Sequence, residues 1–219
     1  MYSKRNDPRM SIVLKAMNFS IEKLYSYGRY KILDKEILRS IEQYFPPSGK
    51  VLDIGCGFGL FSTYFALRND QLAFWGFDKN ERRIHFARQL ADNLGLSNVS
   101  FDVQNAVDVY IKQKYACIYM LDIIHHLPKE YVPQFIQSLV NVLEDGGTLV
   151  IKDVDTFPYP KMVFTWLLDK IMSPQDKVHY WPSNEFMGLL ESNQLTVYRH
   201  SINDILPYSH VLYICHKDK

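Results

Sequence analysis

The stretch Val51-Leu-Asp-Ile-Gly-Cys-Gly-Phe-Gly59 decides the fold of this chain. A short apolar strand carries a carboxylate near its end, and a loop with glycine at every second position then opens a helix. Glycine lets the backbone approach a ligand closely and adopt positive φ angles. The dinucleotide-binding pattern GxGxxG would place its third glycine where this chain has Leu60. Because Asp53 adds negative charge beside the loop, the sequence predicts a cationic ligand here rather than a pyrophosphate.

Strands and helices alternate after this loop. Strands are expected at residues 50–54, 72–77, 99–103, 115–121 and 148–151, and helices at 60–68, 81–94 and 129–143, with a turn at Gly146-Gly147. This order predicts a parallel sheet with helices on both of its faces. Right-handed crossovers would place a ligand at the carboxyl ends of the strands, near the point where the strand order reverses.

The two ends of the chain differ from this pattern. Residues 10–45 have the apolar spacing of two helical stretches, which end at Pro46. In the last third, helices are expected at 162–172 and 184–191, and strands at 195–200 and 210–215. We expect these two strands to pair as an antiparallel hairpin, and Asn193 to end the preceding helix in a left-handed conformation.

Composition bounds the class of protein. A length of 219 residues predicts one domain, with room for an elaboration. The shares of 47% hydrophobic and 22% charged residues exclude disorder as the dominant state. The formal net charge of +1 argues against a strongly basic nucleic-acid binder. Cys56, Cys117 and Cys215 are far apart, which argues against a disulfide framework or a zinc site and favours the cytoplasm. Neither a secretory signal nor an apolar run of about 20 residues is expected.

The stretch at residues 51–59 resembles motif I of class I S-adenosylmethionine-dependent methyltransferases. Further motifs resemble the family in the same order within residues 48–153: Gly76-Phe77-Asp78, Asn105-Ala106, the segment 120–127 and the segment 143–151. The resemblance implies a Rossmann-like, seven-stranded, mostly parallel sheet whose last two strands are antiparallel. It divides the chain into an N-terminal helical cap (1–47), a cofactor-binding core (48–153) and a lid with C-terminal strands completing the same domain (154–219).

The resemblance also implies S-adenosylmethionine as cofactor and S-adenosylhomocysteine as product. The residues that it assigns to the cofactor are Asp53, Gly55, Cys56, Gly57, Phe58, Gly59, Asp78, Lys79, Asn105, Ala106, Leu121 and, for the cofactor's carboxylate, Arg29.

Several of these assignments have alternatives. Asp78 is expected to accept hydrogen bonds from the ribose hydroxyls, but it could also cap the helix that begins near Glu81. Asn105 stands where the family usually has an aspartate that binds the adenine amino group, so its neutral amide would bind more weakly. Arg29 could instead be a solvated surface residue, and the glycine loop could be a tight turn without a ligand.

Catalytic candidates follow the fourth strand. Asp122, His125 and His126 are expected at its carboxyl end, which in the family lies beside the reactive methyl group. Histidine titrates near neutral pH, so either histidine could act as a general base toward a hydroxyl acceptor. His126 could instead be structural and bond to backbone around the glycine loop, while Asp122 could contact the substrate or the sulfonium side. Methyl transfer by proximity alone, without a base, also stays open.

The sequence narrows the class of methyl acceptor only in part. Residues 121–124 lack the Asn/Asp-Pro-Pro-Tyr/Phe tetrapeptide that many amino-methyltransferases carry, and the near-zero net charge disfavours nucleic acid. Aromatic residues are enriched in both terminal regions, and Tyr30, Tyr159, Trp166 and Tyr180 are expected to line an acceptor pocket. Ordinary core packing explains them equally well.

Two weaker interpretations concern the last third of the chain. Residues 162–172 could form an amphipathic helix on a membrane surface, although their low charge counts against it. His179, Asp153 and Asp155 match no metal-ligand spacing, so no metal is expected.

The sequence therefore favours transfer of a methyl group to a small, apolar, aromatic or lipid-like acceptor, with O-methylation first. Alternatives are a methyltransferase that acts on a protein or an RNA, and a non-catalytic module that only binds S-adenosylmethionine. Asn105 favours the module slightly, whereas Asp53, Asp78 and the three loop glycines disfavour it.

Overall fold

The computed structural model describes residues 7–17, 21–32, 35–106, 111–172, 177–202 and 208–218. The chain forms two compact units, Met1–Asn105 and Ala106–Lys219. The boundary between the units falls within the segment 48–153 that the sequence assigns to a cofactor-binding core.

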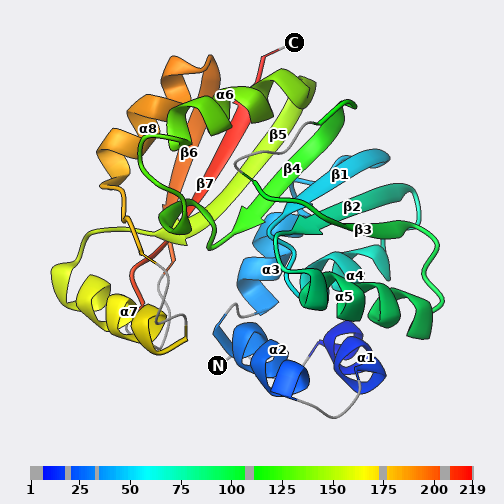
Figure 1. Cartoon of the computed structure of the whole chain (residues 1–219). Helices are drawn as coiled ribbons and strands as arrows, with labels where there is room; N and C mark the ends of the chain where they lie inside the picture. The colour runs from blue at the N-terminus through cyan, green and yellow to red at the C-terminus, as the bar shows by residue number, and fades with distance from the viewer. Residues whose placement is uncertain are drawn as a thin grey trace. The chain divides into compact units, whose positions relative to one another are not determined.

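In the first unit, three parallel strands alternate with two helices (Figure 1). The elements are β1 (Gly49–Ile54), α4 (Leu60–Ala66), β2 (Leu72–Asp78), α5 (Glu81–Asn93) and β3 (Val99–Val103). Strand β2 pairs in parallel with both β1 and β3. The helices contact β2 and β3, and all seven residues of α4 are buried. Because Ile54 pairs with Phe77, β1 and β2 end side by side at the glycine loop.

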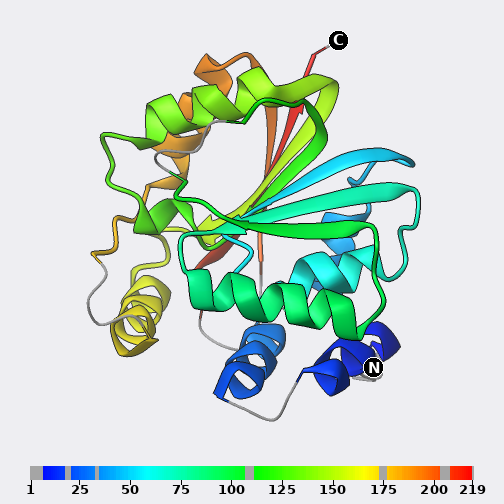
Figure 2. The same cartoon turned by 45° about the vertical axis from the view of Figure 1, so that its right-hand side comes forward.

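Among the described residues before β1 there are three helices, where the sequence predicts two. They are α1 (Pro8–Ala16), α2 (Ile21–Ile32) and α3 (Lys35–Glu42). The first predicted stretch is interrupted because the backbone turns extended at Met17, with φ −72° and ψ 132°. Helix α1 contacts α4 and α5, on the side of α5 that faces away from β2 and β3 (Figure 2).

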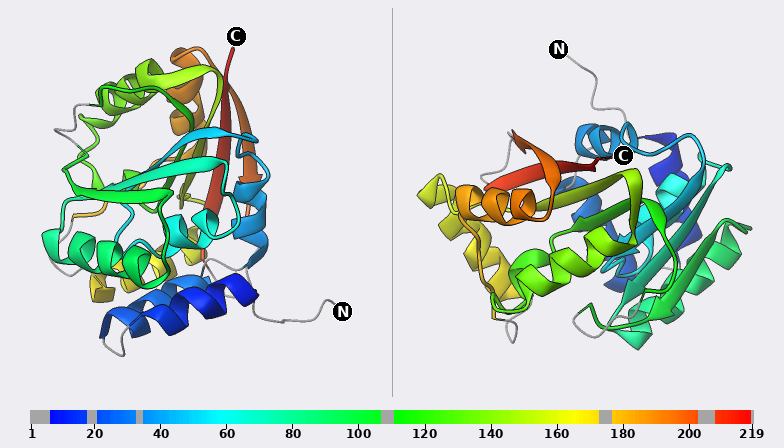
Figure 3. Two further views of the ribbon diagram at one scale, coloured as in Figure 1. Left: turned by 90° about the vertical axis from the view of Figure 1, so that its right-hand side faces the viewer. Right: turned by 90° about the horizontal axis from the view of Figure 1, so that it is seen from above.

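The second unit contains four strands. Strand β4 (Tyr115–Leu121) runs parallel to β5 (Leu143–Val154), and β7 (His210–Lys217) is antiparallel to both β5 and β6 (Leu195–Ser201). The predicted antiparallel pairing of the last two strands is confirmed. Helix α6 (Val132–Val142) contacts β5, and α8 (Ser183–Ser192) contacts β6. Helix α7 (Tyr159–Met172) lies beyond the carboxyl end of β5, away from α6 and α8 (Figures 1 and 3).

The strand order is β3-β2-β1-β4-β5-β7-β6. This order, with its parallel pairs and the antiparallel strand β7, confirms the Rossmann-like, mostly parallel seven-stranded sheet that the sequence predicts. In the part of the chain that the structure describes, no helix combines the length and the apolarity needed to cross a membrane.

Two local predictions are wrong. The predicted turn at Gly146-Gly147 is part of β5, in which the partner of Tyr115 is Leu143 but the partner of Cys117 is Thr148. The extra residues on β5 form a bulge, which uses the positive φ of Gly146 (77°). At the end of α8 the left-handed residue is Gln194 (φ 61°), whereas Asn193 has φ −93°.

A cluster of buried charges joins the N-terminal segment to two other helices of its unit. The Arg9 guanidinium donates to both carboxylate oxygens of Glu42 at 2.7 and 3.0 Å and to the Tyr64 hydroxyl at 2.7 Å. Asp7 caps α1 and accepts a hydrogen bond from the Tyr64 hydroxyl at 2.9 Å. Burial alone would raise the pKa of Asp7 and Glu42. The hydrogen bonds from Tyr64 to Asp7 and from Arg9 to Glu42 outweigh burial, so both pKa values are lowered.

We predict that Arg9→Met lowers the free energy of unfolding at neutral pH by about 3 kcal/mol, because it leaves two buried carboxylates without their cation. In the wild type this contribution is present above the ordinary carboxyl pKa and is lost as the pH falls through the lowered values. Urea denaturation at about pH 7 and at about pH 3 should therefore show a smaller difference between the two proteins at the lower pH.

Arg88→Met is the matched control, because Arg88 pairs with Asp102 at the surface, where both side chains are about half exposed (53% and 50%). We expect a loss below about 1 kcal/mol for this variant. Equal losses in the two variants would show that the buried cluster contributes no more than a surface pair.

Candidate functional site

The glycine loop after β1 is held by backbone hydrogen bonds to the end of β2. The Gly55 and Cys56 amides both donate to the Phe77 carbonyl, at 2.8 and 3.0 Å, and the Gly59 amide donates to the Cys56 carbonyl at 3.0 Å. Gly55, Gly57 and Gly59 all have positive φ, at 72°, 56° and 72°. The loop can adopt this conformation because glycine, which tolerates positive φ, occupies every second position from 55 to 59.

Two of these glycines differ in their surroundings. A Cβ atom on Gly59 would lie 2.8 Å from both Ala87 and Phe101, so this glycine permits α4 to start against α5 and β3. A Cβ atom on Gly57 would meet no atom within 4 Å. Gly57 therefore leaves open space beside the backbone of the loop, which fits the close approach of a ligand.

Asp78, at the end of β2, faces the same loop. Its carboxylate accepts hydrogen bonds from the Gly57 amide (3.1 Å, Oδ2) and the Asn80 amide (2.9 Å, Oδ1). Each oxygen keeps a further lone pair, so the carboxylate can still accept from two vicinal hydroxyls. The alternative role of Asp78 as helix cap is wrong: α5 is capped by Asn80, whose side chain accepts from the Arg83 amide at 3.1 Å.

The loop lies in a negative electrostatic environment. Asp53 is 3% exposed and accepts a hydrogen bond from the Ser62 hydroxyl. Burial raises the pKa of the Cys56 thiol well above its ordinary value, and the charges of Asp53 and Asp78 raise it further. Charges that oppose a thiolate favour a cation, so this loop suits a ligand with a positive centre.

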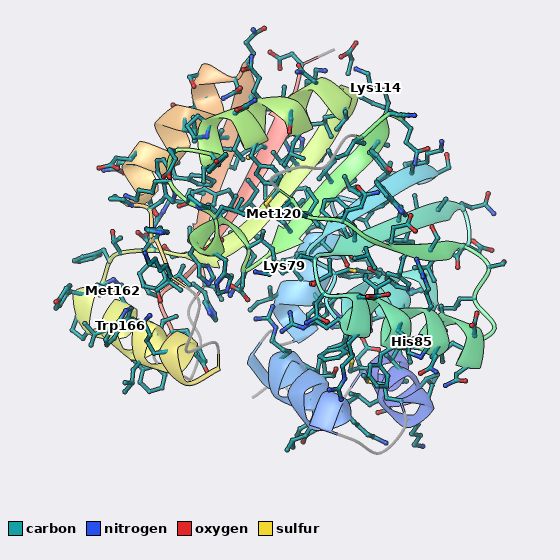
Figure 4. All side chains as sticks on the ribbon, viewed as in Figure 1. Lys79, His85, Lys114, Met120, Met162 and Trp166 are labelled. Atoms are coloured by element: carbon teal, nitrogen blue, oxygen red, sulfur yellow. The ribbon has the colours of Figure 1, made fainter. Side chains whose placement is uncertain are left out.

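The other residues assigned to the cofactor lie at strand ends or on α2. Phe58 contacts Phe86 at a ring distance of 6.1 Å, and Lys79 directly follows β2 (Figure 4). Asn105 is exposed after β3, and Ala106, the first residue of the second unit, is half-buried.

Leu121 is buried at the end of β4, while Arg29 is half-buried on α2. Tyr30, predicted to contact the acceptor, is 6% exposed, and its hydroxyl accepts a hydrogen bond from the Asp7 amide at 3.3 Å. Tyr30 thus joins the buried cluster around Arg9.

The end of β4 carries a buried ion pair. Asp122 adopts a left-handed conformation (φ 60°), its amide donates to the Lys152 carbonyl at 2.8 Å, and its carboxylate pairs with the Lys152 ammonium. Lys152 is fully buried in β5. The sequence gives no reason to select this lysine, apart from its charge directly after the apolar segment 149–151.

Next along the chain, His125 forms a pair with Asp153. The two histidines lie in the short 3₁₀ helix η1 (Ile124–His126). The His125 Nδ1 atom lies 2.6 Å from Asp153 Oδ1, and the Ile124 amide donates to Asp153 Oδ2 at 2.8 Å. His125 is 2% exposed, whereas His126 is half-buried. Asp153 therefore fixes both the imidazole of His125 and the backbone before it, a role that sequence reasoning missed.

Tyr180, an expected acceptor residue, lies close to this pair. Its ring is 5.7 Å from the ring of His125, and the amide of the preceding residue, His179, donates to the His125 carbonyl at 2.7 Å. Two other expected acceptor residues, Tyr159 and Trp166, are on α7 and are exposed by 66% and 43% (Figure 4).

Asp155 belongs to a separate cluster. It accepts from the Ser183 hydroxyl at 2.5 Å and from Arg199 at 2.6 Å. Burial would raise the pKa of Asp155, but these two partners outweigh it and the pKa is lowered. Asp153 and Asp155 thus have different partners. Within the described ranges, no group of three or more His, Cys, Asp or Glu side chains is arranged to hold a metal ion.

Comparison with known proteins identifies relatives of this chain. A family model described as a methyltransferase domain matches residues 47–203. The chain is 30% identical over 147 residues to the probable S-adenosyl-L-methionine-dependent methyltransferase TehB of Haemophilus influenzae, covering 64% of this chain and 50% of TehB.

Other relatives differ in what they methylate. The chain is 30% identical over 126 residues to 2-heptyl-1-hydroxyquinolin-4(1H)-one methyltransferase of Mycobacteroides abscessus, covering 57% of this chain and 54% of that protein. A shorter match, 40% identical over 53 residues (24% of this chain, 22% of the relative), is to ribosomal RNA small subunit methyltransferase G of Psychrobacter arcticus. The first two matches, to TehB and to the quinolone methyltransferase, span about half the length of each relative.

Solved structures show the same fold. The structure of magnesium protoporphyrin IX methyltransferase from Synechocystis PCC 6803, with bound S-adenosylhomocysteine, superposes with a TM-score of 0.67 at 17% identity and covers 96% of this chain and 100% of that one. This likeness confirms the Rossmann-like fold, and the matched family model identifies the chain as a member of the S-adenosylmethionine-dependent methyltransferase family.

Proposed function

We propose that this protein transfers a methyl group from S-adenosylmethionine to a small apolar, aromatic or lipid-like acceptor, with a hydroxyl as the favoured methyl-accepting group. The observation that carries the proposal is the buried His125–Asp153 pair directly after β4. A dedicated base is of use for a hydroxyl, which must lose a proton as it is methylated.

In this proposal most of the residues that contact the cofactor belong to the first unit. Asp78 accepts from the ribose hydroxyls, the backbone around Gly57 admits the cofactor closely, and Asp53 contributes negative charge near the loop. Asn105 and Ala106 bind the adenine, and Arg29 binds the carboxylate. The bound cofactor supplies a methyl group on a positively charged sulfur, which is activated toward nucleophiles without help from the protein.

His125 is the proposed general base. If Nδ1 carries the proton that is shared with Asp153, then Nε2 presents a lone pair, and the imidazole can take a proton from the acceptor hydroxyl. Asp153 acts as a positioning residue, because it fixes this tautomer and also anchors the Ile124 amide at 2.8 Å. Asp122 is proposed to contact either the substrate or the cofactor near its sulfonium group. Its carboxylate is positioned by the ion pair with Lys152. His126 is the second candidate for the base.

The acceptor class is inferred from one aromatic neighbour of the proposed base and from the relatives. The ring of Tyr180 lies 5.7 Å from the ring of His125. The relative named for methylation of a heptyl-hydroxyquinolinone is consistent with a small aromatic acceptor. The relative named for ribosomal RNA favours the second candidate function, a macromolecular acceptor, against which the net charge of +1 counts. Tyr159 and Trp166 are exposed on α7, which favours contact with a surface outside the protein over contact with the acceptor.

We keep the cytoplasm as the proposed compartment. Cys56, Cys117 and Cys215 are all buried as free thiols, as expected for a protein that folds under reducing conditions.

A methyl-transfer screen tests the proposed function. Radiolabelled S-adenosylmethionine would be incubated with the protein and with phenols, hydroxy acids, lipid extracts, ribosomal RNA and a mixed protein fraction. We expect label in a small-molecule fraction. Label in RNA or protein alone would establish a macromolecular acceptor instead, and no transfer despite tight binding of S-adenosylhomocysteine would favour the non-catalytic module.

Removal of the Asp78 carboxylate should weaken cofactor binding. We expect Asp78→Ala to bind S-adenosylhomocysteine at least about tenfold more weakly in titration calorimetry, because a diol loses its charged acceptor. Asp102→Ala, at the half-exposed carboxylate of β3, is the control and should bind like the wild type. Undiminished affinity of Asp78→Ala would remove Asp78 from the cofactor site.

Loss of the proposed base should reduce turnover without loss of cofactor. We expect His125→Gln to lower kcat by about 100-fold or more, and Asp153→Asn to lower it to a similar degree because the tautomer is no longer fixed. Affinity for S-adenosylhomocysteine should stay unchanged, and the acidic limb of the pH–rate profile should disappear in His125→Gln.

His85→Gln on the exposed face of α5 serves as control for the loss of an imidazole. If His125→Gln keeps full activity while His126→Gln loses it, the base is His126. Full activity in both variants would argue for methyl transfer without a base.

A further inference from the structure

Helix α7 presents an apolar stripe on its outer side. Tyr159, Val163, Trp166 and Leu167 are 66%, 40%, 43% and 52% exposed. At about 100° per residue, their positions fall on one face of the helix, in a sector about 100° wide. Phe157, two residues before the helix, is 75% exposed and extends this apolar surface.

The opposite side of α7 is anchored to its own unit. Phe164 contacts the ring of Tyr208 at 5.7 Å, and the hydroxyl of buried Thr165 accepts from the Ser209 amide at 3.3 Å. The Ser209 hydroxyl donates to the Phe157 carbonyl at 2.8 Å, which fixes the entry to the helix. Because these contacts use one face, the orientation of α7 in the second unit is set, and the apolar stripe is its outer face.

The stripe ends in a positive charge. Lys170 lies four residues after Trp166 and therefore in line with the stripe, at the carboxyl end of the helix. Residues 159–177 contain three lysines (Lys161, Lys170 and Lys177) and two aspartates (Asp169 and Asp176). A lysine aligned with apolar and aromatic side chains can bury its methylene groups among them while its ammonium reaches phosphate.

We propose that α7 docks the protein on an anionic lipid surface, with Phe157, Tyr159, Val163, Trp166 and Leu167 entering the headgroup region and Lys170 at the phosphates. Tyr and Trp are the residues most enriched at membrane–water interfaces. A single helix of 14 residues that presents one apolar stripe lies in the interface rather than across the membrane. Charge complementarity to lipid phosphate selects an anionic bilayer as the occupant of this face.

This proposal does not depend on the acceptor, because lipid binding is measured without methyl transfer. It gives Tyr159 and Trp166 a role that their exposure supports, in place of contacts within an acceptor pocket. The low charge of residues 162–172 argues against a membrane-surface helix when only the sequence is considered. In the structure, Lys170 places a positive charge at one end of the apolar stripe.

The test is co-sedimentation with vesicles. The full chain would be mixed with vesicles of phosphatidylcholine alone or of phosphatidylcholine with phosphatidylglycerol. We expect binding to the anionic vesicles, weakened by raised salt, and little binding to the neutral ones. Val163→Glu and Leu167→Glu should each reduce the vesicle-bound fraction by at least about tenfold, because each would place a charge in the apolar stripe.

Two further variants sharpen the result. Lys170→Gln should weaken binding to anionic vesicles by about fivefold and leave neutral vesicles unaffected. Tyr198→Glu, at a 53% exposed aromatic residue on β6, is the matched control for adding charge and should bind like the wild type.

Circular dichroism and thermal melting would confirm that each variant folds. Absence of binding to anionic vesicles by the folded wild type would overturn the proposal. So would an equal loss in Tyr198→Glu and Leu167→Glu, or a concentration-dependent dimer, abolished by Leu167→Glu, in a protein that ignores vesicles.

Discussion

The hydrogen bond from the Gly57 amide to the Asp78 carboxylate is the interaction on which the candidate cofactor site depends. Parallel strands β1 and β2 end side by side, and their last residues pair as Ile54 and Phe77. The loop after β1 then folds back over the end of β2, and the Phe77 carbonyl accepts two of its amides. A side chain at residue 78 that accepts from the third amide closes the loop against the strand. Glycine is needed at 59 for packing and at 57 for access, so one short segment meets two separate demands.

Residues at the end of β4 depend on a different principle, the pairing of buried charge. Lys152 and Asp153 are neighbours on β5, and their side chains alternate to opposite faces of the strand. One of them holds Asp122 and the other holds His125 and the Ile124 amide. Leaving any of these groups without its partner would be costly, because each is at least nine-tenths buried. The segment from Asp122 to His126 is therefore fixed from both sides by consecutive residues of a single neighbouring strand.

The sequence predicted the strands and helices between residues 50 and 215, because apolar periodicity and the glycine loop report directly on backbone conformation. It failed where a side chain at a distance decides the outcome. Gly146-Gly147 has the local chemistry of a turn, yet pairing with β4 keeps it in a bulged strand. Asp78 has the local chemistry of a helix cap, yet Asn80 caps α5 and frees Asp78 for the loop. The sequence does not predict the pairing of Lys152 with Asp122 or of Asp153 with His125, because these partners lie about thirty positions earlier in the chain, a separation that no local pattern reveals.

Helix α7 shows why composition is a poor guide to surfaces. The net charge of +1 is a sum over all 219 residues. It therefore does not report where apolar or charged side chains gather on one face, such as the stripe on α7. The contacts of Phe164 with Tyr208 and of Thr165 with Ser209 fix which face of the helix looks outward. Exposing Tyr159, Val163, Trp166 and Leu167 to water does not stabilise the fold, because the hydrophobic effect opposes the exposure of apolar side chains. This unfavourable exposure is the physical argument for the proposed contact of α7 with a lipid surface.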